Sequence, residues 1–459
     1  MLRKHFSVIL AFLAATALGG CTLSEKAMLP APEEVVSEVL SVQSLLAETS
    51  SAKVDITLGF PDAVADAVRI DPQTHSARQA VLVGSSSLDE LRAQLQPQIS
   101  GRVYAGIQDV DAGDAGAAAT LNLSQIVFDG GVLDNRISAA NFEKQAAFEN
   151  YRSVLNQRAF DATVAWIDLN RYERLNRLIK ARLEVLNPLI NQLEQVASAG
   201  IGDATTVASA KRQVTMIRVT ETQIQEQYQQ AREKFTRTFG QLPRSSSYDA
   251  SLILKAVPSN VSDASVMASP AVMQAYNRYM SAEASARAVE ARKSVSMSLE
   301  GALTEPADGS PDNSSASVGF VLRKNLYDGG ALEAQIEGAR QDAEGRRSLL
   351  EGAFREILEK TQDARQTITA TRASVELARE NAKIAREEID ILRKQLSIGQ
   401  STLSSVLQAE ARLYDAEANM INFTTNGVIA QVTLLSVIGR LSETIGIDAG
   451  QELLGEVSE

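Results

Sequence analysis

The run Leu121-Asn-Leu-Ser-Gln-Ile-Val-Phe-Asp-Gly-Gly131 returns later in the chain as Phe320-Val-Leu-Arg-Lys-Asn-Leu-Tyr-Asp-Gly-Gly330. The two Asp-Gly-Gly triplets are 199 residues apart. Two further pairs of glycines keep this offset: Gly200 and Gly399, and Gly240 and Gly439. An offset held over this length predicts an internal duplication. Each copy reads in the same order: alternating strands, a tight turn, a very long helix, a glycine turn and a returning helix.

Strand pairs are expected over about residues 97–129 and about 294–328. Apolar and polar residues alternate along these runs, which predicts strands with one apolar and one polar face. Each run has about ten residues, the length that a tilted strand needs to cross a bilayer. No later stretch reads as an uninterrupted spanning helix, so a membrane crossing is expected to use strands. The edge of a soluble β-sandwich is the alternative.

Long helical hairpins are expected over about 131–240 and about 331–439, each extending on the order of 100 Å at about 1.5 Å per residue. Pro188 is the one proline of the first long helix. Apolar residues recur at steps of three and four along both arms, which predicts antiparallel coiled coils. In the first hairpin these residues are Ile179, Leu183, Leu186, Ile190, Leu193 and Ala197, answered by Val207, Ala210, Val214, Ile217 and Ile224. In the second they are Ala378, Ala382, Ala385, Ile389, Leu392 and Leu396, answered by Val406, Ala409, Leu413, Ala416 and Phe423.

The N-terminal residues predict an exported chain. Two basic residues, a short apolar run and small residues form a signal peptide over 1–20. The box Leu18-Gly19-Gly20-Cys21 resembles the cleavage site of bacterial lipoproteins, which implies that Cys21 is lipidated and sorted to the outer membrane. A tether over 21–60 follows, and then a helix over about 62–95 that breaks at Asp71-Pro72 because proline lacks an N–H. An ordinary signal peptide with a chance cysteine is the alternative.

The residues needed for catalysis are not gathered in recognisable motifs. The formal net charge of −12 disfavours binding to nucleic acid. His75 is the only histidine after the signal peptide and is expected on a helix surface, so no histidine-rich metal site is expected and a histidine-based triad is disfavoured. No glycine-rich phosphate loop occurs, and Trp166 is expected to be a packing residue. The sequence therefore predicts no enzyme, cofactor or metal.

Together these features resemble the TolC-like outer-membrane efflux protein family, and its lipidated branch. The resemblance covers about residues 60–445 and rests on the two Asp-Gly-Gly turns, the hairpin tips at 200–210 and 399–409, and the duplication. It implies a mainly α fold with a transmembrane β part, in two repeats over 61–245 and 246–445 and a tail over 446–459. It also implies a homotrimer in which three sheets close a twelve-stranded barrel, continued by a helical tunnel through the periplasm.

The resemblance suggests two groups of site residues. The strand-to-helix turns are Asp129, Gly130, Gly131, Asp328, Gly329 and Gly330. The hairpin tips, which would gate the pore and dock an adaptor, hold Gly200, Gly202, Thr206, Val207, Gly399, Ser405, Val406 and Gln408. Relatives carry aspartates where Ser405 and Gln408 stand, so a neutral, hydrogen-bonded closure is expected here. The nearby acids Asp203 and Glu410 are interpreted first as solvated charges on helix surfaces.

The favoured interpretation is the passive exit duct of a tripartite export system in the bacterial outer membrane. The resemblance implies a periplasmic adaptor (membrane fusion) protein and an inner-membrane RND or ABC pump that supplies the energy. The cargo would be small molecules or a type I secreted protein, and lipidation favours small molecules. The main alternative is a lipid-anchored periplasmic coiled-coil scaffold without a pore. An envelope hydrolase that uses carboxylates is the third and least favoured interpretation.

Overall fold

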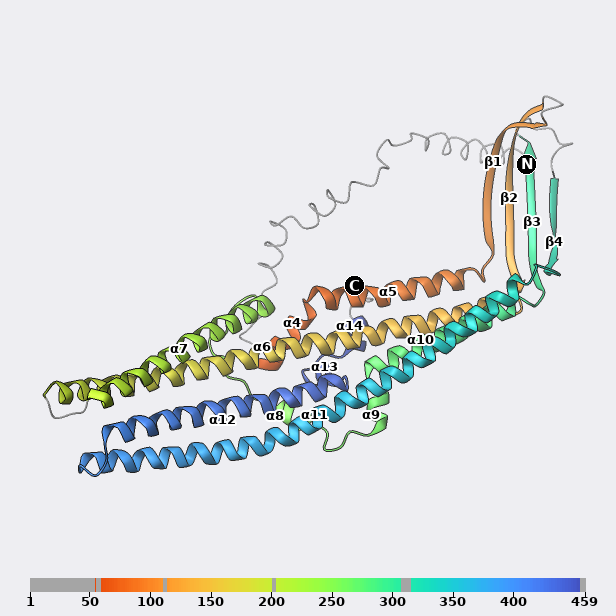
Figure 1. Ribbon diagram of the computed structural model, residues 1–459. Coiled ribbons are helices and arrows are strands. Elements are labelled where there is room, and N and C mark those ends of the chain that lie inside the picture. Colours follow the sequence, from red (N-terminus) through yellow and green to blue (C-terminus); the bar gives the residue numbers. More distant parts are fainter. Residues whose placement is uncertain (1–53, 55–58, 110–113, 200–203, 307–314, 455–459) are drawn as a thin grey trace. The chain divides into compact units, whose positions relative to one another are not determined.

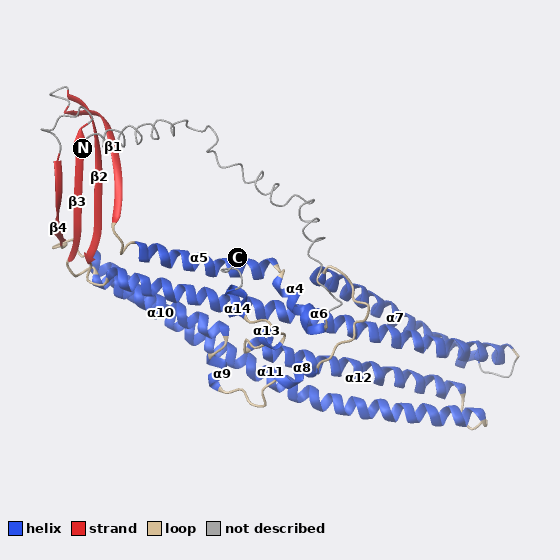
Figure 2. Ribbon diagram, turned by 180° about the vertical axis from the view of Figure 1, so that it is seen from behind, coloured by secondary structure: helices blue, strands red, loops and turns tan. Residues whose placement is uncertain are grey.

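The computed structural model describes residues 54, 59–109, 114–199, 204–306 and 315–454 of the 459-residue chain. The predictions for Cys21, most of the tether, Gly200, Gly202 and Asp203 lie outside these residues. Long antiparallel helices and one four-stranded sheet make up the described part (Figure 1). The sheet stands at one end of the helical layer, next to the ends of α5, α10 and the starts of α6 and α11 (Figures 1 and 2).

The duplication is visible in the helix boundaries. Helices α6 (Val132–Ser198) and α11 (Ala331–Ser397) each have 67 residues and start 199 residues apart. Their returning partners, α7 (Ala204–Phe239) and α12 (Leu403–Val437), also start 199 residues apart. Pro188 lies inside α6 without ending it. The two long hairpins predicted from the sequence are therefore confirmed.

Where their side chains are described, which leaves out Leu193, Ala197 and Ala210, the residues of both seams are largely buried or half-buried, as the heptads predict. Ile179, Leu186 and Ile190 of α6 are buried, and so are Ala382, Ala385 and Ile389 of α11. The prediction is wrong at one residue of α12. Phe423 is 37% exposed, whereas Ile421 and Thr425 of the same helix are buried. Because α12 packs against α6 as well as α11, its inward face follows both neighbours rather than a single heptad seam.

Shorter helices precede each sheet segment. Helix α4 (Phe60–Arg69) ends before α5 (Pro72–Ala93), and Asp71 caps α5 by accepting hydrogen bonds from the N–H groups of Gln73 (2.8 Å) and Thr74 (3.3 Å). The predicted break at Asp71-Pro72 is thus confirmed. In the second half, α10 (Pro270–Ala291) has the same length as α5 and packs against α6 and α11. Pro72 and Pro270 open the two equivalent helices, 198 residues apart.

The sheet has the order β1-β2-β3-β4, and all neighbours are antiparallel. Its strands are β1 (Gln98–Asp109), β2 (Asp114–Phe128), β3 (Ser296–Pro306) and β4 (Ser315–Arg323). The register aligns Gly101, Leu121 and Leu303 across three strands, and Leu299 with Phe320. One face is therefore apolar, and the other carries Ser100, Asn122, Ala302 and Ser317 in one row. Strands β1 and β4 are the edges and pair with no further strand in the described part of the chain.

The main core lies where the hairpins join the shorter helices. Trp166 packs edge-on against Phe60, Phe235 and Phe239, at ring distances of 5.2–5.5 Å, and its Nε1 donates a hydrogen bond to the carbonyl of Ser246 (3.1 Å). Trp166 is a packing residue, as the sequence predicts. The helices α8 (Ser251–Ala256), α13 (Leu441–Thr444) and α14 (Ala449–Leu454) complete this region, whereas α9 (Asp263–Met267) packs against α11 in a separate cluster.

Helix α12 is long and apolar enough to cross a membrane by length and composition alone. Its inward residues, among them Val406, Ala409, Ala416 and Val432, are buried against other helices. The apolar composition is therefore explained by packing on two sides.

Candidate functional site

Each strand-to-helix turn uses two glycines with left-handed backbones. The φ angles are +69° and +88° at Gly130 and Gly131, and +70° and +87° at Gly329 and Gly330. A residue with a Cβ is strained in this region, which explains the glycine pair in both copies. The two turns are conformationally equivalent, so the second repeat leaves the sheet by the same bend as the first.

The aspartate of each turn caps the long helix that follows. Asp129 accepts hydrogen bonds from the N–H groups of Gly131 (2.9 Å) and Leu133 (2.6 Å). Asp328 accepts from Gly330 (3.1 Å) and Leu332 (3.1 Å). These bonds satisfy N–H groups that the first turn of a helix leaves without partners. The Asp-Gly-Gly triplet therefore fixes the direction in which each 67-residue helix departs from the sheet.

The surroundings of the two turns differ. A Cβ added at Gly130 would lie 2.3 Å from the Cβ of Ser294, which follows α10. A Cβ added at Gly329 would meet no described atom within 4 Å. The first turn is thus packed by the second half of the chain, while the equivalent second turn is open. Beside it, Leu326 and Tyr327 are 88% and 89% exposed.

The tip of the second hairpin is well defined. Gly399 has φ +73° at the reversal, and Thr402 caps α12 by accepting a hydrogen bond from the N–H of Ser405 (3.2 Å). Gln408 is exposed and Ser405 is half-buried. Val406 is 1% exposed and packs beside Ile389 and Ala409. Val406 therefore shapes the tip from within and presents no surface to a partner.

The tip of the first hairpin is described only in part. Gly200 and Gly202 lie outside the described residues. Thr206 belongs to α7, and its side chain is likewise outside the description. Val207 is half-buried and packs against a cluster that contains Leu186 and Val214. The equivalent residues Val207 and Val406 of the two tips both pack inward.

The interpretation of Glu410 as a solvated surface charge is wrong. Its side chain is buried, and its carboxylate forms ion pairs with Arg182 of α6 and Arg393 of α11. Arg182 is also buried, and its Nε and Nη2 have no hydrogen-bond partner among the described residues. Burial, helped by the charge of Arg393, lowers the pKa of Arg182 to about 9. The sequence does not predict this cluster, because Arg182 and Glu410 belong to different hairpins.

The apolar face of the sheet is exposed. Ile99, Val318, Phe320 and Leu322 are each more than two-thirds exposed. An apolar surface of this size needs cover, and alternating strands with one such face are typical of membrane barrels. The opposite face is polar. Four strands with this division and two unpaired edges can form part of a barrel wall but cannot close one alone.

Comparisons with known proteins agree with this geometry. The sequence profile of the family described as outer membrane efflux protein matches residues 65–241 and 262–440. The chain is similar to the outer membrane efflux protein BepC of Brucella suis, with 21% identity over 421 residues, which cover 90% of each protein.

Two solved structures illustrate the similarity of the fold. The open state of the Neisseria gonorrhoeae MtrE outer membrane channel aligns with a TM-score of 0.72 and 15% identity, over 85% of this chain and 93% of that one. The Campylobacter jejuni CmeC outer membrane channel aligns with a TM-score of 0.71 and 13% identity, over 88% of this chain and 90% of that one. Two repeats, each with a β-hairpin and long helices, confirm the predicted fold class.

Proposed function

Because the chain belongs to the outer membrane efflux protein family and is an outer-membrane efflux channel of the TolC type, we propose that three copies form the passive exit duct of a tripartite export system. It is a transport protein and not an enzyme. Channels of this family form trimers with tripartite efflux partners. The proposal for this chain concerns its own assembly, its docking surface, its anchor and its cargo.

The main support for the proposed trimer is that the two equivalent turns have different surroundings. Gly130 is packed against Ser294, whereas Gly329 is open. The equivalent helices α5 and α10, which precede the strands in the two repeats, start 198 residues apart. The residue of the first repeat that is equivalent to Ser294 is therefore Gln96. Gly329 of one copy would therefore pack against Gln96 of the next. The contact between Gly130 and Ser294 within one chain would thus be repeated between Gly329 and Gln96 of neighbouring chains. Three copies joined in this way would form a closed ring.

The same argument gives the register of the new strand pair. Within the chain, Leu123 of β2 pairs with Gly301 of β3. The equivalent residues are Leu322 of β4 and Val103 of β1. Strand β4 of one copy would then pair antiparallel with β1 of its neighbour. This pairing removes both sheet edges and leaves every apolar face directed to the membrane.

The helices offer a matching surface. Leu377, Ile384 and Ile391 of α11 and Ile398 at its C-cap stand seven residues apart and are 54–73% exposed. In the first repeat the equivalent of Leu377 is Leu178, which packs near Tyr414 and Ile421 of α12. By the repeat relation, the stripe on α11 packs against α7 of the neighbouring copy. That helix exposes Met216 and Val219, which fit an apolar coiled-coil contact.

The hairpin tips are the proposed docking surface for a periplasmic adaptor protein. Gln408 is exposed near the second tip. The chain has no nucleotide-binding loop, so an inner-membrane RND or ABC pump supplies the energy. Substituting Gln408 by Arg is expected to reduce export in cells while leaving the trimers intact. Normal export by this variant would exclude Gln408 from the docking surface.

Cys21 is the proposed lipid anchor, and small molecules are the preferred cargo over a type I secreted protein. Both points are supported by the sequence around Cys21. Metabolic labelling with a radioactive fatty acid tests the anchor, because Cys21→Ser should abolish the label. A label retained by the variant would contradict it.

The duct itself is tested by conductance. Detergent-purified full-length protein is sized and then reconstituted into planar bilayers. The proposal expects trimers that open water-filled channels. Trimers that give no conductance would favour the pore-free scaffold, and a folded protein that remains monomeric at all concentrations would remove the basis of the duct.

A further inference from the structure

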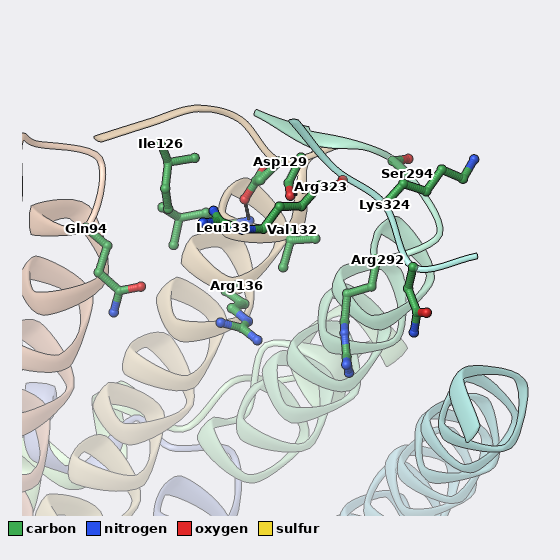
Figure 3. Close-up of a pocket in the computed structure, with 12 residues that line it drawn as sticks. Gln94, Ile126, Asp129, Val132, Leu133, Arg136, Arg292, Ser294, Arg323 and Lys324 are labelled. Atoms are coloured by element: carbon green, nitrogen blue, oxygen red, sulfur yellow. Dashed lines mark hydrogen bonds between the residues drawn. The ribbon is translucent and has the colours of Figure 1, made fainter. Parts of the chain in front are cut away.

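We propose that basic side chains at the base of the sheet form an anion-binding girdle in the bore, which selects carboxylate or phosphate groups of the cargo. This inference rests on the proposed channel. The candidate site is a pocket of about 340 Å³ where the strands give way to the helices. Figure 3 shows it beside the start of α6, next to the ends of α5 and α10.

The pocket is unusually basic for a chain with a net charge of −12. Arg136, Arg292, Arg323 and Lys324 line it, together with a single carboxylate, Asp129. That carboxylate is already committed to the N–H groups of Gly131 and Leu133. Arg323 is paired with Glu300 outside the lining, at 2.7 Å. Counting Glu300 as well, the site keeps a surplus of two positive charges per copy.

The surplus charge is available to a ligand. Arg136 and Lys324 are exposed and form no ion pair within the described part of the chain. Arg292 donates to the neutral side-chain oxygen of Gln335 (2.6 Å), which leaves its charge uncompensated. Guanidinium and ammonium groups recognise carboxylates and phosphates through charge-assisted hydrogen bonds. The pocket therefore suits an anionic group that enters from water.

The position of Arg323 in the sheet places the site in the bore. Arg323 pairs with Ser296 on the polar face, and Ser296 also lines the pocket. Closing the barrel turns this face inward, away from lipid. The register proposed for neighbouring copies sets Arg323 opposite Arg102 of the next copy, which adds a further cation. Three copies then place a ring of positive charge around the path of the cargo, as in anion-selective pores.

Phospholipid headgroups carry the same phosphate chemistry, but they would reach the apolar side of the wall. The two sources are separated by the choice of bilayer. If the cations act in the bore, their effect on permeation is the same in neutral and in anionic lipid. If they bind headgroups, the effect depends on anionic lipid, and the proposal is overturned.

The experiment measures reversal potentials of reconstituted trimers in a potassium chloride gradient. The double variant Arg136→Gln with Lys324→Gln is expected to lower the ratio of chloride to potassium permeability at least about twofold near 0.1 M salt, where the Debye length is about 10 Å. The difference should shrink near 1 M salt, where that length is about 3 Å. Inorganic phosphate should block the wild-type current more strongly than the variant current.

The matched control keeps the charges and exchanges the side chains, as Arg136→Lys with Lys324→Arg. It is expected to retain the wild-type permeability ratio. An unchanged ratio in the glutamine variant would overturn the girdle while leaving the channel in place. Trimers without any conductance would instead overturn the channel itself, so the two failures are distinguishable.

Discussion

The guanidinium of Arg182 on α6 contacts the carboxylate of Glu410 on α12, and both side chains are buried. This pair ties the first hairpin to the second, and Arg393 of α11 completes the cluster. Breaking a buried ion pair from one side leaves an uncompensated charge, which costs far more than the net value of the pair. The cluster therefore makes the relative placement of the hairpins depend on one carboxylate.

We expect Glu410→Ala to lower the free energy of unfolding by about 3–5 kcal/mol. The control is Glu388→Ala, whose exposed pair with Arg412 should be worth at most about 1 kcal/mol. The double variant Arg182→Met with Glu410→Met should recover most of the loss, because it leaves no buried charge of the pair. Thermal unfolding of the detergent-solubilised protein measures all three. Equal effects of Glu410→Ala and Glu388→Ala would contradict the buried cluster.

A matched pair of glycine substitutions separates folding from assembly. Both Gly130→Ala and Gly329→Ala place a Cβ on a left-handed backbone, at about 1–2 kcal/mol each. Gly130→Ala also collides with Ser294 inside the chain and should lower the yield of folded monomer. Gly329→Ala should leave the monomer folded and weaken the trimer. Circular dichroism and size-exclusion chromatography report the two effects, and a normal trimer from Gly329→Ala would argue against the proposed contact with Gln96.

Asn156 of α6 has a specific structural role that the sequence does not reveal. Its side-chain oxygen accepts hydrogen bonds from the N–H groups of Leu441 (2.8 Å) and Ser442 (3.1 Å) at the start of α13. We expect Asn156→Leu to cost about 1–3 kcal/mol because two buried donors lose their acceptor. Gln157→Leu, at an exposed neighbouring position, should change stability little. A variant at Asn156 as stable as the wild type would show that water replaces the lost bonds.

Asp168 is expected to make the stability of the fold depend on pH. Burial raises the pKa of its carboxyl, and the charges of Arg171 and Lys234 oppose the rise only in part. The folded state therefore holds the proton to a higher pH than the unfolded state, and stability falls as pH rises through the window above the ordinary value. We expect Asp168→Asn to raise the thermal midpoint at pH 7 and to lose this advantage below pH 4. A midpoint lowered equally at both pH values would contradict this.

Several parts of the fold follow from the sequence for clear physical reasons. The Asp-Gly-Gly offset reveals the duplication because a left-handed turn accepts little besides glycine. Period-two alternation gives the strand faces, and long runs without glycine give α6 and α11. The helical hairpins are local consequences of these patterns, whereas the register between β2 and β3 joins the two repeats and does not follow from them.

The remaining features depend on contacts between distant segments. Arg182 stands beside Leu183 in a heptad seam and looks like a surface residue until α12 brings Glu410 to it. Phe423 fits the heptad but points outward, because α12 has two neighbours. Gly130 packs on Ser294 from the other half of the chain, and the basic pocket is also lined by residues of both halves. No local sequence pattern predicts either feature.

Cysteine cross-linking between neighbouring copies tests the central claim, that three open sheets close one barrel. Paired strand residues lie about 4.5–5.5 Å apart at Cα, within the range of a disulfide. The chain carrying Leu322→Cys and Val103→Cys should form covalent trimers on oxidation. The pair Leu322→Cys with Arg102→Cys should not, because Arg102 points to the opposite face. Oxidation that yields only monomers, or links both pairs equally, would contradict the proposed barrel.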